Sequence, residues 1–195
     1  TVAVGVLILQ IGCGEKLGDR ASVGLAIREM KGGHRGFRVK TVVPVGEVRV
    51  KRRLADNLDI YVRGQWSQVE VEAQREILKE IRGTGKGNFG SAGVGLNYFP
   101  LGTRWLGLDV GGETYQAKYQ MRGWYGPVGQ TTADRFWGRG LNLGAVGEIP
   151  FDKNGKWRFV WGAGYNFTET NAGKVGADLD GWYGAAAIEV PLSRK

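Results

Sequence analysis

The sequence has little of what several common protein classes require. A single cysteine, Cys13, excludes an internal disulfide framework and a cysteine-rich zinc site. The single histidine, His34, lies among glycine and basic residues in KGGHRG, a setting typical of an exposed loop rather than of a proton-transfer site. Metal-ligand spacing is absent as well. We therefore expect no catalytic residue, no metal and no cofactor.

Long apolar runs are also missing. No stretch of about 20 apolar residues occurs, which excludes a membrane-spanning helix. Prolines number only 5, whereas glycine reaches 34 and the aromatic residues make up 11%. High glycine together with many aromatic residues, without a repeat period, is typical of tightly curved all-β structure.

The charge balance is basic, with a net charge of +8 from 27 basic and 19 acidic residues. A solvated surface accounts for such a balance, and so does contact with an anionic partner such as lipid phosphates. No basic helix and no aromatic RNA-binding motif supports nucleic acid, so we expect no nucleic-acid partner.

Residues 156–168 alternate cleanly between two kinds of side chain. Trp157, Phe159 and Trp161 fall on one face, and Arg158, Gly162 and Gly164 fall on the other. A period of two predicts a strand. The aromatic face would form the core of a soluble sandwich, but it would face lipid in a membrane barrel, where small and polar residues fill the lumen.

The same alternation recurs in residues 21–30, 58–66, 88–99, 141–151 and 182–192. Two further segments change phase midway, one across Gly46 and one across Gly111-Gly112, and in each a one-residue β-bulge would restore the facing. Across all strands, the side chains expected to face lipid are Val23, Leu25, Ile27, Val94, Leu96, Leu106, Leu108, Leu141, Leu143, Trp157, Phe159, Trp161, Tyr165, Phe167, Ile188 and Val190.

The connections are expected to alternate in length. Short turns are predicted at 54–57, 100–103 and 152–155, and longer loops at 31–36, 74–87, 123–133 and 171–180. Such alternation is typical of tight periplasmic turns and longer external loops, and counting from Arg20 gives eight strands. One helix is predicted in an external loop, over 74–82 (QREILKEIR).

Segments such as GSAGVGLNYFP, GLNLGAVGEIPF and WRFVWGAGYNFTET resemble the small bacterial outer-membrane β-barrels of the OmpA, OmpX, OmpW and opacity-protein type, over roughly residues 20–192. The resemblance implies an all-β fold, an eight-stranded antiparallel up-and-down transmembrane β-barrel in the bacterial outer membrane. Such proteins usually end in an aromatic residue, whereas this chain ends Pro191-Leu192-Ser193-Arg194-Lys195.

Residues 1–19 are expected to form a separate apolar segment before a barrel domain over 20–195. TVAVGVLILQIGC is similar to the apolar core of a secretory signal, with Gly12-Cys13 similar to a lipoprotein cleavage box. A retained strand or a plug inside the barrel is the alternative.

The predicted lumen holds charges of both signs. The expected lumen residues are Arg28, Arg38, Lys40, Glu47, Arg49, Lys51, Asp59, Arg63, Asp109, Glu113, Glu148, Lys156, Arg158 and Glu189. An eight-stranded barrel is just wide enough for side chains to fill it, and buried charges must pair. A closed, salt-bridged core is therefore expected, and a narrow pore is the alternative.

Three functions follow from these features. The first is a non-enzymatic structural or interaction role in the cell envelope, with membrane lipids, anionic lipid phosphates or a protein bound at the external loops as partners. The second is a narrow pore for small anions or amphipathic solutes, because the inner face is rich in glycine and leans basic. The third is a soluble β-barrel or sandwich that binds a hydrophobic ligand or serves as an assembly subunit, with the aromatic face as its core.

Overall fold

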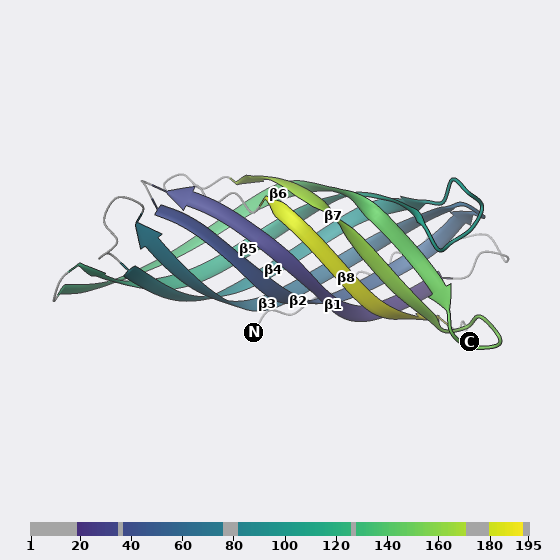
Figure 1. Cartoon of the computed structure of the whole chain (residues 1–195), viewed down its shortest axis with the longest axis horizontal. Coiled ribbons are helices and arrows are strands. Elements are labelled where there is room, and N and C mark those ends of the chain that lie inside the picture. Colours follow the sequence, from purple (N-terminus) through teal and green to yellow (C-terminus); the bar gives the residue numbers. More distant parts are fainter. Residues whose placement is uncertain (1–18, 35–36, 76–81, 126–127, 171–179, 193–195) are drawn as a thin grey trace.

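In the computed structural model, the described residues (19–34, 37–75, 82–125, 128–170 and 180–192) form a closed barrel of eight antiparallel strands. The strands are β1 (Asp19–His34), β2 (Phe37–Ala55), β3 (Leu58–Arg75), β4 (Arg82–Tyr98), β5 (Gly107–Tyr125), β6 (Val128–Pro150), β7 (Arg158–Thr170) and β8 (Gly181–Pro191). They wind obliquely around one long axis (Figure 1). The predicted fold class is confirmed.

Closure comes from β1, which pairs with both β2 and β8. Val23 of β1 lies opposite Val48 on one side and Ile188 on the other, and each strand pairs with its neighbour in sequence. Backbone donors and acceptors along the paired stretches are thereby satisfied within the barrel. Among the described residues there is no helix with the length and apolar character needed to cross a membrane.

The barrel wall has the reverse polarity of a soluble protein. Val23, Leu25 and Ile27 are 59–69% exposed, whereas Ser22, Ala26 and Arg28 on the opposite face are at most 4% exposed. The same division continues around the barrel, because successive side chains in a strand point to opposite faces. Apolar side chains therefore cover the outside, and polar side chains fill the axis.

The two predicted β-bulges are wrong. β1 and β2 pair without interruption past Gly46, and β5 pairs in continuous register with β4 and β6 past Gly111-Gly112. Between β2 and β3 the register shifts between Arg53 and Ala55, beside the turn, and pairing is interrupted between Arg38 and Gly46 with the same register on both sides.

The apolar residues that suggested those bulges point into the lumen. Val43, Val45, Tyr115 and Ala117 are all buried, and the ring of Tyr115 stacks on Phe89 with 6.3 Å between centroids. The half of the lumen farther from the start of β1 and the end of β8 is thus partly apolar. A strand there carries apolar residues on both faces with no change of register.

The connections also differ from the prediction. β4 begins at Arg82, β5 ends at Tyr125 and β6 begins at Val128, so most of the predicted loops 74–87 and 123–133 is strand. The pairing of β3 with β4 continues to Gln74 opposite Arg82, because main-chain hydrogen bonds extend a hairpin whatever its side-chain pattern. Strict short–long alternation is therefore wrong, and the helix predicted over 74–82 is wrong at both ends. Its middle, 76–81, and residues 1–18 lie outside the described residues.

Candidate functional site

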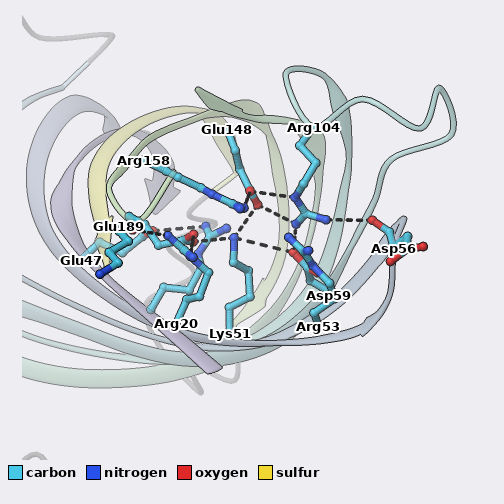
Figure 2. A network of polar contacts seen from close by, with 12 residues as sticks. Arg20, Glu47, Lys51, Arg53, Asp56, Asp59, Arg104, Glu148, Arg158 and Glu189 are labelled. Atoms are coloured by element: carbon cyan, nitrogen blue, oxygen red, sulfur yellow. Dashed lines mark hydrogen bonds and ion pairs between the residues drawn. The ribbon is translucent and has the colours of Figure 1, made fainter. Parts of the chain in front are cut away.

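The end of the lumen at which β1 begins and β8 ends holds a network of ion pairs, here named the lower network. Its centre is the carboxylate of Glu148, which accepts hydrogen bonds from Lys51, from Nε and Nη2 of Arg104 at 2.8 Å each, and from Arg158 at 2.6 Å. Figure 2 shows these cations converging on Glu148 from different parts of the wall. Glu148 and Lys51 are 2% and 4% exposed, so the centre of the network lies out of water.

Two further carboxylates complete the lower network. Glu189 of β8 pairs with both Lys51 and Arg20. Asp59 of β3 pairs with Arg104 and lies 3.6 Å from Lys51 and 3.7 Å from Arg53. The network therefore joins β1, β2, β3, β6, β7, β8 and the connection between β4 and β5 (Figure 2).

Arg104 reaches this network from outside the strands. It belongs to the connection 99–106, donates a 3.1 Å hydrogen bond to the Asp56 carbonyl, and places its guanidinium 4.2 Å from the centre of the Phe99 ring. Burial opposes its charge, but hydrogen bonds and attraction from Glu148 and Asp59 outweigh burial and raise the pKa of Arg104. Arg104 therefore stays charged, and its contacts with Glu148, Asp59 and the Asp56 carbonyl hold the connection 99–106 against the lower network.

A second polar group, here named the upper network, fills the lumen farther along the axis. Arg28 pairs with Glu113, and Arg63 donates through Nη2 to Glu113 and to Asn142, each at 3.2 Å. Gln65 donates to Glu47 at 2.7 Å. Four strands, β1, β3, β5 and β6, are linked through Glu113 and Asn142 alone.

A small cavity of about 10 Å³ adjoins the space between the two networks. Its polar lining is formed by Ser22, Glu47, Arg49 and Asp109. Nε of Arg49 and Oδ1 of Asp109 have no hydrogen-bond partner within the protein, although Tyr183 donates to the other Asp109 oxygen at 2.9 Å. A cavity of this volume is about the size of one water molecule.

The structure gathers most of the expected lumen charges inside the barrel. The buried ones are Arg28, Glu47, Arg49, Lys51, Asp59, Arg63, Asp109, Glu113, Glu148 and Glu189. Arg158 is half-buried, and the side chains of Arg38 and Lys40 lie outside the described residues. Lys156 is exposed, since it precedes β7, so its expected place in the lumen is wrong.

Three arginines of the lower network were not among the predicted lumen residues. Arg20 and Arg53 lie at strand ends, and Arg104 lies in a connection, where alternation carries no information about facing. The expected lumen charges already leaned basic, so no sequence signal called for a further cation such as Arg104.

The outer face carries the residues expected to meet lipid. Twelve of the 16 are well exposed, namely Val23, Leu25, Ile27, Val94, Leu96, Leu108, Leu141, Leu143, Trp157, Phe159, Phe167 and Ile188. Leu106, Trp161, Tyr165 and Val190 are half-buried. Leu106 precedes β5 rather than lying in a strand, and Tyr165 packs edge-on against Trp182 with 5.3 Å between ring centroids.

The aromatic side chains frame this apolar belt. Trp105, Phe151 and Trp157 are exposed in the connections at the lower-network end, and Trp66, Trp137 and Trp182 are exposed toward the other end. Two aromatic girdles around an apolar band are typical of membrane β-barrels. An aromatic face that is exposed rather than packed contradicts the third prediction, a soluble barrel with this face as its core.

Hydrocarbon is the solvent that suits such a belt, and a closed antiparallel barrel is the β-sheet form that satisfies its backbone there. The protein has the fold of a small outer-membrane β-barrel. Among the described residues no group of three or more histidine, cysteine, aspartate or glutamate side chains is placed to hold a metal ion.

Solved structures of outer-membrane proteins share this fold. OprG from Pseudomonas aeruginosa aligns with a TM-score of 0.57 and 13% identity, over 91% of this chain and 97% of that one. A major outer membrane protein from Thermus thermophilus gives 0.52 and 12%, over 89% and 99%. Ail, the attachment invasion locus protein of Yersinia pestis, solved with the heparin analogue sucrose octasulfate, gives 0.50 and 14%, over 89% and 97%.

These alignments confirm, at the level of the fold, the resemblance that the sequence predicted. No family model matches the chain, and no curated protein matches its sequence.

Proposed function

We propose that this protein is a non-enzymatic barrel of the bacterial outer membrane whose closed lumen serves stability rather than transport. The observation that carries this proposal is the packing of the lower network. Glu148 faces Lys51, Arg104 and Arg158 at once, so the axis is filled by side chains that hold one another. The protein then acts through its outer surface and its ends.

The energetics of the lumen favour closure over the alternative of a narrow anion pore. Removing one partner of a buried ion pair costs about 3–5 kcal/mol, and a solute would have to separate such pairs in both networks. The cavity beside Arg49 and Asp109, at about 10 Å³, takes a water molecule but not a hydrated ion. Both networks therefore favour a lumen that is closed to solutes.

Planar-bilayer recordings with the purified protein test this proposal. We expect no conductance steps in concentrated potassium chloride, while unboiled samples migrate differently from boiled samples on a gel because the folded barrel resists detergent. Reproducible conductance steps from protein that shows this difference in migration would refute the closed lumen. Equal migration of both samples would count against a membrane barrel.

The partners proposed for this barrel lie outside the lumen. The apolar belt contacts membrane lipids, and the net charge of +8 favours anionic lipid phosphates at its edges. A protein partner at the external connections stays a prediction, because residues 76–81 and 171–179 lie outside the described residues.

A further inference from the structure

An ion pair lies on the outer wall of the barrel, apart from both networks in the lumen. Arg139 of β6 lies directly opposite Glu169 of β7 in the strand register. Nη2 of Arg139 lies 2.7 Å from Oε2 of Glu169, and the two side chains are 75% and 67% exposed. We name Arg139 and Glu169 the outer ion pair.

The outer ion pair lies on the membrane side of the aromatic girdle that includes Trp137. Along the outward face of β6, Arg139 stands between Trp137, which is 57% exposed, and Leu141, which is 52% exposed. On β7, Phe167 precedes Glu169 on the same face and is 50% exposed. Because exposed tryptophans mark the level of the lipid headgroups, the outer ion pair lies where headgroups give way to hydrocarbon. Less water solvates charges there than above the girdle, so covering the pair with a protein surface costs little solvation.

The side chains around the outer ion pair leave both of its charges open to a partner. On the β5 side, Arg139 lies opposite Thr114, which is exposed and uncharged. Among the described side chains of β5, β6 and β7, the nearest further outward charge is Lys118, two outward positions beyond Thr114. Each member of the pair thus meets one opposite charge in its own chain, and its exposed side is accessible to a second opposite charge.

A second copy of this chain fits the outer ion pair by symmetry. In a two-fold dimer whose axis follows the membrane normal and passes beside β6 and β7, each β6 faces β7 of the other barrel. Arg139 then meets Glu169 of the second copy, and Glu169 meets Arg139 of the second copy. The two outer ion pairs become one cluster of alternating charges, so the surface is complementary to itself.

The wall beneath the outer ion pair permits close approach of two barrels. Ala145 of β6 lies opposite Ala163 of β7, and Ala163 lies opposite Gly184 of β8. A methyl group added at Gly184 would meet nothing within 4 Å, so the wall is open at this level. Small residues let membrane-spanning segments come close, which favours van der Waals contact between them in lipid. Leu141 and Phe167, opposite each other between these small residues and the outer ion pair, add apolar area to the same face.

We propose that the protein forms a two-fold dimer in the membrane through the outward faces of β6 and β7, with the outer ion pairs of the two copies in contact. The inference rests on the proposed membrane location and adds to it a partner, a second copy of this chain. Each lumen stays as it is, because the contact uses the outer wall and neither network.

Two charge reversals separate contacts between copies from the contact within one chain. Arg139→Glu leaves two carboxylates at the site and Glu169→Arg leaves two guanidinium groups, so each variant alone repels its own copy. Dimerisation of each variant alone should weaken at least about 100-fold, which is about tenfold for each of the two symmetry-related contacts. Mixed together, the two variants set opposite charges against each other at both contacts and should form heterodimers, although the pair within each chain is broken.

Native mass spectrometry of barrels released from vesicles measures this outcome, because the two variants differ in mass. The matched control is Arg52→Glu, which reverses an arginine that pairs with Asp19 at the lower-network end, and it should dimerise like the wild type. Gel migration of unboiled samples verifies that each variant is folded. Unfolding of single barrels is a separate readout, since an exposed pair contributes little to stability within one chain.

The inference is overturned if the wild type stays monomeric in vesicles at every protein-to-lipid ratio. Dimers of Arg139→Glu or of Glu169→Arg that are as stable as those of the wild type would overturn it as well. Monomers alone in the mixture of the two folded variants would reject the assigned contact. Conductance steps from a barrel that dimerises as expected would refute the closed lumen while this inference stands.

Discussion

Replacing Glu148 by glutamine should destabilise the barrel strongly while leaving its shape nearly unchanged. The substitution is almost isosteric, but it removes the negative charge that Lys51, Arg104 and Arg158 share. After the substitution, Lys51 and Arg104 still pair with Asp59. Arg158 loses the carboxylate with which it pairs in the lower network. Removing one partner of a buried pair costs about 3–5 kcal/mol, and we expect a loss near the lower value, about 3 kcal/mol.

Urea unfolding of vesicle-inserted protein, followed by tryptophan fluorescence, measures this loss. With a slope of about 2 kcal/mol per molar urea, a loss of about 3 kcal/mol moves the midpoint down by about 1.5 M. The matched control is Glu169→Gln, which breaks the exposed pair with Arg139, whose side chains are 67% and 75% exposed. An exposed pair contributes less than about 1 kcal/mol, so the control should shift the midpoint by under about 0.5 M. Equal midpoints for Glu148→Gln and the control would refute the reasoning.

Two further predictions address the wall. Leu25→Arg places a charge on a belt side chain that is 69% exposed, so insertion into vesicles should become less favourable by about 2–4 kcal/mol, whereas equal folding yields at matched urea would argue against a lipid-facing belt. Gly95→Ala would bring a methyl group into the ring of Tyr61 and should lower the free energy of unfolding by about 1–3 kcal/mol. The control Gly64→Ala, whose methyl group meets nothing within 4 Å, should leave stability unchanged or slightly raise it. Equal effects of the two substitutions on the urea midpoint would disprove this packing.

The sequence predicted the architecture because alternating apolar and polar residues indicate a strand with one apolar and one polar face. Along β1, apolar Val23, Leu25 and Ile27 alternate with inward-facing residues such as Ser22 and Arg28. Closure and strand number followed from the turn signals and from the need to satisfy every strand edge in lipid.

The prediction failed where alternation stops carrying information. Val43 and Tyr115 are apolar but face inward, because the lumen is partly apolar at that depth, and no sequence pattern reports depth along the axis. Lys156 fell outside the lumen because the boundary of β7 lies two residues later, at Arg158. Arg104 joined the lower network through its position in a connection, which depends on three-dimensional closure rather than on local sequence.

The reversed polarity of the wall has a consequence for how the chain reaches its destination. In water, closing the barrel would hide side chains such as Arg28 and Glu148 that water solvates well, and would leave Leu25 and Trp182 uncovered. The driving force for folding therefore has to come from the bilayer itself, as the belt leaves water for hydrocarbon. In water, before insertion, folding of the barrel is not favoured. A chaperone that binds the apolar segments of the unfolded chain would therefore keep it from aggregating until it reaches the membrane.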